Sequence, residues 1–216
     1  MLKIKCVPVG PLWTNSYIVW DTDSREGFLV DPGDEGKRLV QEVRKNGVTI
    51  KKIVLTHGHF DHLKDAAFVS SELKAPVLAN KEDLPLIQHA SEQAVFFGFP
   101  PITPPDIQTF LGQNSSLSAG HYTFEVLATP GHSPGSITLF NSAEGAAIVG
   151  DLLFLESIGR TDITGGDYAT LLTSIQKFIL TLPDATKILS GHGEETTVGH
   201  ERLYNPFLTG VYRDEA

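Results

Sequence analysis

The segment Thr56-His57-Gly58-His59-Phe60-Asp61-His62 contains four candidate metal ligands, namely His57, His59, Asp61 and His62. Imidazole nitrogens and carboxylate oxygens suit zinc, iron or manganese, and the lack of thiolate ligands argues against a structural zinc finger. Gly58 is expected to permit a tight turn between the histidines. Histidines exposed in a loop are the alternative, but three histidines and an aspartate at this spacing favour a metal site.

Three further candidate ligands, His132, Asp151 and His192, each follow an expected strand. His132 lies in the rigid turn Thr129-Pro130-Gly131-His132-Ser133-Pro134-Gly135, Asp151 ends an apolar run, and His192 lies between two glycines. Each is a weak signal alone, because a single histidine beside a turn commonly makes only hydrogen bonds. Together with the first segment they form an ordered set of seven.

Short strands and amphipathic helices alternate along the chain, and the strand before Thr56 leads directly into the first ligand segment. The expected strands are 2–9, 16–21, 27–31, 50–55, 121–128, 136–140, 146–149 and 187–189. The expected helices are 35–45, 61–73, 81–97, 167–182 and 198–204. Strands followed by a helix, twice over, predict two similar halves packed sheet to sheet with helices outside. With no linker composition, residues 1–216 are expected to form a single domain.

Composition excludes several classes of protein. The net charge of −9 disfavours a nucleic-acid partner, because a polyanion requires a basic patch. The apolar runs are too short to span a membrane, and no signal peptide is visible. A single cysteine, Cys6, fits a reducing compartment such as the cytoplasm and is expected in the core. The composition leaves the oligomeric state open.

The ligand pattern resembles the metallo-β-lactamase superfamily, whose members carry a His-x-His-x-Asp-His motif and distant His, Asp and His ligands. The resemblance extends over nearly the whole chain and implies an α/β (α+β) fold, a four-layer αββα sandwich with the site at one edge. It also implies two divalent metal ions, zinc first, with iron or manganese as alternatives. His57, His59 and His132 would hold one ion, Asp61, His62 and His192 the other, and Asp151 would bridge them.

Three segments narrow the resemblance to glyoxalase II: Gly159-Arg160-Thr161-Asp162, Gly191-His192-Gly193 and 196–207. The implied activity is hydrolysis of a small thioester such as S-D-lactoylglutathione to an acid and a thiol. A metal-bound hydroxide would attack the acyl carbon. Asp61 would act in catalysis by binding one ion and orienting this nucleophile.

The match to glyoxalase II is incomplete. Full-length members have a C-terminal helical domain that grips glutathione, and the 24 residues after His192 are too few for it, so a short form is expected. Members also place a lysine and a tyrosine where this chain has Arg160 and Asp162. Arg160 is expected to bind a substrate carboxylate, and the alternative is a structural salt bridge to Asp162.

The rival function is that of the persulfide dioxygenases, which share this fold and use one iron held by two histidines and an aspartate. They also resemble the chain at 159–162, but the Gly191-His192-Gly193 context and the segment 196–207 favour the hydrolase. A β-lactamase is disfavoured without an export signal, a nuclease by the acidity, and a binding module by the complete ligand set. The other histidines, His89, His121 and His200, are expected on the surface or in ordinary hydrogen bonds.

Overall fold

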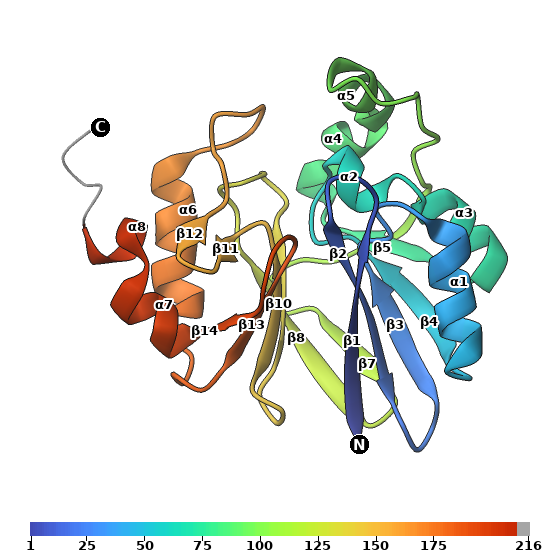
Figure 1. The fold of residues 1–216 in the computed structure, drawn as a ribbon, viewed down its shortest axis with the longest axis horizontal. Coiled ribbons are helices and arrows are strands. Elements are labelled where there is room, and N and C mark those ends of the chain that lie inside the picture. Colours follow the sequence, from blue (N-terminus) through green and yellow to red (C-terminus); the bar gives the residue numbers. More distant parts are fainter. Residues whose placement is uncertain (211–216) are drawn as a thin grey trace.

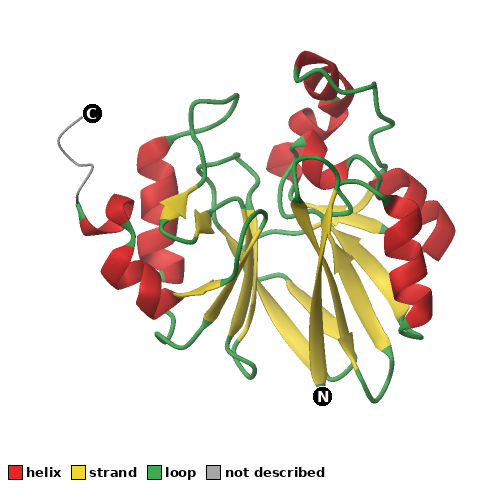
Figure 2. Cartoon of the chain, in the orientation of Figure 1, coloured by secondary structure: helices red, strands yellow, loops and turns green. Residues whose placement is uncertain are grey.

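The computed structural model describes residues 1–210, which form two six-stranded β-sheets packed face to face with helices on both outer sides (Figures 1 and 2). This arrangement confirms the predicted four-layer αββα fold. The first sheet has its strands in sequence order; its first three are antiparallel and the rest run parallel to the third. They are β1 (Leu2–Val9), β2 (Thr14–Asp21), β3 (Glu26–Val30), β4 (Thr49–Val54), β5 (Val77–Ala79) and β6 (Ile107–Phe110).

The second sheet has the order β14-β13-β10-β9-β8-β7 and is antiparallel except between β10 and β13. A short two-stranded ribbon follows β10. The strands of this half are β7 (Ser116–Ala119), β8 (Tyr122–Ala128), β9 (Ile137–Asn141), β10 (Ala146–Gly150), β11 (Leu153–Phe154), β12 (Ser157–Ile158), β13 (Lys187–Ser190) and β14 (Thr196–Thr197).

Two groups of helices form the outer layers, one beside each sheet (Figure 1). Beside the first sheet lie α1 (Gly36–Lys45), α2 (Phe60–Leu63), α3 (Ala66–Leu73), the 3₁₀ turn η1 (Lys81–Asp83), α4 (Leu84–Gln88) and α5 (Ala90–Phe96). Beside the second lie α6 (Tyr168–Ser174), which continues as the π-helical η2 (Ile175–Ile179), then α7 (Val198–Tyr204) and α8 (Pro206–Thr209).

The core has three layers because strand side chains alternate between the faces of a sheet. On β2, Ile18 packs toward the first helical layer, whereas Tyr17 packs between the sheets. Between the sheets the rings of Phe28 and Phe124 meet edge to face with centroids 5.1 Å apart. A third cluster joins the second sheet to α6 and η2. The fixed packing of both sheets makes their shared edge a stable platform for a site.

Two predicted helices are divided in the structure. The helix expected over 61–73 is interrupted at Lys64 and Asp65, where the Asp65 carboxylate accepts a hydrogen bond of 2.6 Å from the Gly36 N–H at the start of α1. The helix expected over 81–97 becomes η1, α4 and α5, with Pro85 in the first turn of α4. In the first case a tertiary hydrogen bond, and in the second a proline, outweighs the helical spacing of the apolar residues.

The carboxyl ends of β3, β4, β8, β10 and β13 lie at one edge of the sandwich, at the top of Figure 1. The two sheets are joined there by backbone hydrogen bonds. The Ile137 N–H donates to the Thr56 carbonyl at 2.9 Å, and the Asn15 N–H donates to the Gly191 carbonyl at 2.7 Å. Loops that follow strands of different sheets therefore meet at this edge.

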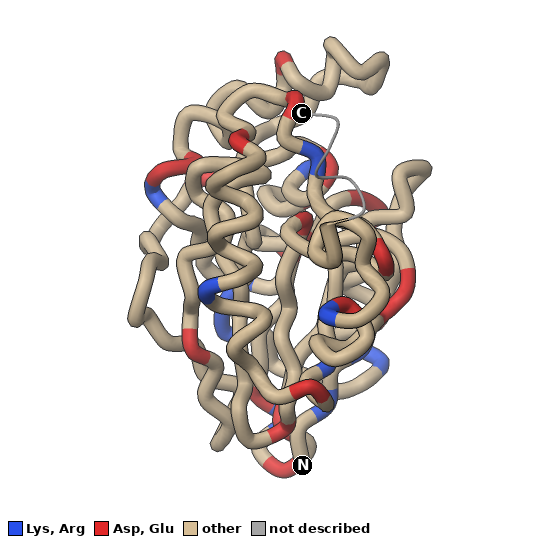
Figure 3. The backbone as a smooth tube through the Cα atoms, turned by 90° about the vertical axis from the view of Figure 1, so that its left-hand side faces the viewer, with Lys and Arg blue, Asp and Glu red and all other residues tan. Residues whose placement is uncertain are grey.

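Charged residues are dispersed over the surface, with 17 Lys and Arg against 26 Asp and Glu in the sequence. Figure 3 shows basic positions separated from one another among acidic ones on the side that carries α6 and α7. Within residues 1–210, no helix combines the length and apolar character needed to cross a bilayer.

Candidate metal centre

All seven predicted ligands lie at the shared edge of the two sheets. His57 and His59 follow β4, and Asp61 and His62 lie in the first turn of α2. The other three follow strands of the second sheet: His132 follows β8, Asp151 follows β10 and His192 follows β13. Each sheet therefore contributes ligands to one cluster.

The first group contains the three histidines His57, His59 and His132, whose ligand atoms lie within 4.8 Å of one another. The Nδ1 atom of His59 lies 2.9 Å from Nε2 of His132. His57 and His132 are buried. Three converging imidazole nitrogens form a set that could hold one divalent ion.

The second group contains Asp61, His62 and His192, again with ligand atoms within 4.8 Å. The Nε2 atoms of the two histidines are 3.3 Å apart, and Nε2 of His192 is 3.3 Å from Oδ2 of Asp61. Two nitrogens and one carboxylate could hold a second ion.

Asp151 lies between the two groups. Its Oδ2 atom is 3.6 Å from Nε2 of both His132 and His192, and its Oδ1 atom is 3.3 Å from Nε2 of His62. A Cβ atom at Gly191 would lie 2.1 Å from Oδ1 of Asp151, so the backbone of the last ligand loop can approach only as glycine. From this position Asp151 could hold an ion at either group.

The ring nitrogens that face away from the centre are anchored. Nδ1 of His132 donates to the Arg160 carbonyl at 2.8 Å, and Nδ1 of His192 donates to the Leu12 carbonyl at 3.0 Å. Such bonds fix the tautomer and leave the Nε2 lone pair directed at the centre. The outer contacts therefore orient the imidazoles as ligands.

Asp31 is a site residue that the sequence reading did not identify. Its side chain is buried, and it accepts hydrogen bonds from Nδ1 of His62 at 2.8 Å and from the Thr56 N–H at 2.7 Å. From the sequence, Asp31 is expected only as the last residue of the strand 27–31. The available signal was that Asp31 follows an apolar strand, as Asp151 does.

Two buried polar atoms at the centre test the fit of metal ions. Among the described residues, Nε2 of His57 and Oδ1 of Asp151 are inaccessible to solvent and have no hydrogen-bond partner. Such an atom costs about 1–3 kcal/mol when nothing satisfies it. Both atoms belong to the predicted ligand set, so the residues present fit metal binding. The two groups described above suggest two ions, and a third group, Asp31, His57 and His62, shares a histidine with each of them.

The electrostatics of the two groups differ. Burial, together with the neighbouring histidines, lowers the pKa of His57 well below its usual range and that of His59 to about 4. Burial also lowers the pKa of His62, but Asp151, Asp61 and Asp31 outweigh it and raise that pKa well above the usual value. The surroundings therefore disfavour protonation of His57 and His59 and favour protonation of His62.

Arg160 lies on the surface beside the centre. Its guanidinium makes a two-point contact with Asp162, with Nε 2.8 Å from Oδ1 and Nη2 3.0 Å from Oδ2. This is the salt bridge that the sequence offered as the alternative, while the backbone carbonyl of Arg160 holds His132. A role in substrate binding stays a prediction.

The remaining histidines lie where the sequence predicted. His89 is exposed, His121 bonds Asp21 at 2.8 Å, and His200 bonds Glu156 at 3.0 Å. The expectation for Cys6 was wrong. Its side chain is exposed, although the same strand carries the buried residues Leu2, Val7 and Val9.

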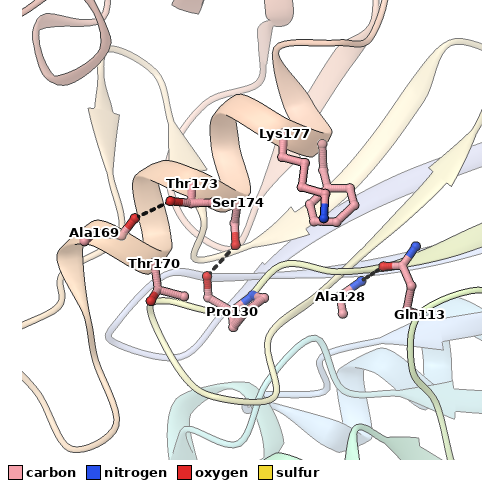
Figure 4. Close-up of a pocket in the computed structure, with 9 residues that line it drawn as sticks. Gln113, Ala128, Pro130, Ala169, Thr170, Thr173, Ser174 and Lys177 are labelled. Atoms are coloured by element: carbon pink, nitrogen blue, oxygen red, sulfur yellow. Dashed lines mark hydrogen bonds between the residues drawn. The ribbon is translucent and has the colours of Figure 1, made fainter.

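One groove lies away from the metal ligands. It has a volume of about 680 Å³ and runs between α6 and the end of β8, behind the loop that carries His132 (Figure 4). In it the Ser174 hydroxyl donates to the Pro130 carbonyl at 2.6 Å. Helix α6 therefore anchors this ligand loop from the side opposite the centre.

The fold and the clustered ligands define the chain as a member of a known class. A family model described as the metallo-β-lactamase superfamily matches residues 9–192, and the chain belongs to this superfamily. Metal-dependent hydrolases make up the class.

Similar proteins carry names that refer to different activities or bound metals. "Hydroxyacylglutathione hydrolase GloC" of Haemophilus influenzae is 37% identical, over 96% of this chain and 98% of its own length. The structure of the BLEG-1 B3 metallo-β-lactamase is 38% identical with a TM-score of 0.90, covering 96% of this chain and 100% of that one. The structure of TTHA1623 in a di-iron-bound form is 36% identical with a TM-score of 0.86, covering 94% and 100%. Relatives at similar identity thus carry different names.

Proposed function

We propose that this protein is a thioester hydrolase that cleaves S-D-lactoylglutathione or a similar acyl thioester to an acid and a thiol. The observation that carries the proposal is the position of Asp151 between a three-histidine group and an Asp-His-His group. Similarity to the Haemophilus influenzae hydroxyacylglutathione hydrolase over nearly the full length of both chains supports the substrate class.

We assign a separate role to each group of candidate ligands. His57, His59 and His132 would hold one divalent ion, Asp61, His62 and His192 the other, and Asp151 both. When bound, the ions lower the pKa of a water molecule and polarise the acyl carbonyl. Asp61 would also orient the attacking water. In the overall reaction the water oxygen bonds to the acyl carbon, the carbon–sulfur bond breaks, and the sulfur leaves with its electron pair and takes a proton.

Zinc-loaded protein tests the proposal under anaerobic conditions. S-D-lactoylglutathione is expected to release free thiol, because a Lewis acid without redox chemistry suffices for hydrolysis. Chelated protein is the control and should release none. Oxygen uptake with glutathione persulfide by iron-loaded protein, without anaerobic thioester cleavage, would instead establish a dioxygenase. Hydrolysis of a chromogenic β-lactam without thioester cleavage would assign a lactamase.

A further inference from the structure

Asp83, the last residue of η1, is a fully buried carboxylate at the metal centre with no role in the ligand set. It lies on the connection between β5 and α4, which supplies no ligand. Among the described residues it forms no ion pair with a lysine, arginine or histidine. Burying a carboxylate without a neighbouring cation costs free energy, so its hydrogen bonds must offset that cost.

Three donors surround this carboxylate and occupy both oxygens. Oδ2 accepts from the Gly58 N–H at 2.7 Å and from the Ser133 hydroxyl at 2.6 Å. Oδ1 accepts from the Gly135 N–H at 2.6 Å. All three bonds are short and favour the ionised carboxylate, whereas burial raises the pKa of Asp83.

The donors belong to the two loops that present the three-histidine group. Gly58 lies between His57 and His59, and Ser133 is the neighbour of His132. One loop follows β4 of the first sheet and the other follows β8 of the second. A single side chain thus joins two ligand loops that no continuous secondary structure connects.

Packing around the two glycines shows that the approach is close. A Cβ atom at Gly135 would lie 2.6 Å from the Asp83 backbone nitrogen. A Cβ atom at Gly58 would lie 2.9 Å from Cβ of Leu86 and 3.0 Å from the Asp83 carbonyl oxygen. Gly58 does not have a positive φ, so close approach to this segment, and not the expected tight turn, explains the glycine.

We propose that Asp83 is a positioning residue that fixes the distance between the His57–His59 loop and the His132 loop, and thereby sets the metal affinity of the three-histidine site. The inference rests on the proposed assignment of these histidines as ligands. Loss of Asp83 therefore affects the first site, while the Asp61, His62 and His192 site is held by other contacts.

Asp83→Asn is the primary test, because it preserves shape but turns an amide N–H₂ toward donors. We expect metal affinity at the three-histidine site to fall about 10- to 100-fold, the range typical when a residue that orients metal ligands through hydrogen bonds is lost. Affinity at the second site should change little. Stepwise zinc titration against a chromophoric chelator, together with the absorption spectrum of cobalt-loaded protein, measures the two sites separately from activity.

Glu201→Gln is the matched control. Glu201 is also fully buried and also accepts three hydrogen bonds, from Thr196 Oγ1 at 2.6 Å, Asn205 Nδ2 at 2.7 Å and the Glu156 N–H at 3.0 Å. None of these residues is a candidate ligand. This variant should lose thermal stability but keep both metal affinities.

Ser133→Ala covers the case in which Asp83→Asn does not fold, since it removes one donor and leaves the carboxylate. It should weaken the first site by less than Asp83→Asn does, in the same direction. Unchanged metal affinity at the first site in Asp83→Asn overturns the proposal. If only Ser133→Ala folds, unchanged first-site affinity in that variant does the same. An equal loss of first-site metal affinity in Glu201→Gln also overturns it. Because metal binding is read directly, a wild-type protein that binds two ions but cleaves no thioester refutes the proposed substrate and leaves this inference standing.

Discussion

Asp151 is the residue on which the two ligand groups depend together, because its two oxygens face histidines of both groups. Asp31 and Asp83 act behind the ligands, one on His62 and the other on the loops of the first group. Arg160 combines an exposed side chain with a backbone carbonyl that orients His132. The residues of the site therefore have two kinds of role: some are candidate ligands, and others orient those ligands.

Asp151→Ala tests the bridging assignment. Wild-type protein is expected to hold close to two metal ions per chain, and the variant should lose metal at both sites, because both share the carboxylate. Hydrolysis should fall by at least roughly 10- to 100-fold, the loss that is typical when a residue hydrogen-bonded to a metal ligand is removed. Elemental analysis and thioester kinetics measure the two effects. One tightly bound ion, unchanged by the substitution, would contradict the two-ion arrangement.

Arg160→Ala tests whether this side chain binds the anionic part of the substrate. A charged hydrogen bond lost equally from the ground and transition states should raise KM about tenfold with little change in kcat. Asp162→Asn should have the opposite effect on KM, because it frees the guanidinium from its partner. An unchanged KM with a lower melting temperature in Arg160→Ala would show that the pair is structural.

The segment from β4 through α2 is the element that determines the site, since it contributes to both ligand groups within one loop and one helical turn. Its histidines nevertheless have different surroundings. His57 and His59 face other histidines, whereas His62 faces carboxylates. One short element therefore holds two histidines whose surroundings disfavour protonation and one whose surroundings favour it.

This difference predicts distinct pH dependences for the two ions. The raised pKa of His62, and that of His192, means that metal must displace a proton at the second site. Affinity there should fall about tenfold per pH unit per displaced proton as pH drops from 7.5 to 6. The lowered pKa of His57 and of His59 means that metal displaces no proton from these two ligands, so first-site affinity should fall less steeply over that range. Calorimetric titration at several pH values measures both slopes, and equal slopes would refute the prediction.

At the scale of the whole molecule, the site exists because two sheets meet at one edge. The first sheet supplies four of the predicted ligands and the second supplies three. Backbone hydrogen bonds of 2.7 and 2.9 Å join the sheets there, and the inter-sheet core fixes their distance. A metal pair at this edge would be bound by both halves of the sandwich.

The sequence alone was sufficient for the fold class and for the candidate ligands that the fold brings together. Ligands that directly follow strands are recognisable because strand periodicity and turn residues are local properties. Most strands and helices were predicted for the same reason. The exceptions were short strands such as β5 and β6 and the helices divided at Asp65 and beside Pro85, where tertiary contacts or a single residue outweigh periodicity.

Only the tertiary structure decided what holds the ligands in place. Asp31 reaches His62 across 31 positions, and Asp83 reaches Ser133 across 50, so no spacing rule relates them. The exposure of Cys6 was likewise visible only in the folded chain. Ligand chemistry is encoded in residue type and local order, whereas orientation depends on hydrogen bonds between segments that only the folded chain brings together.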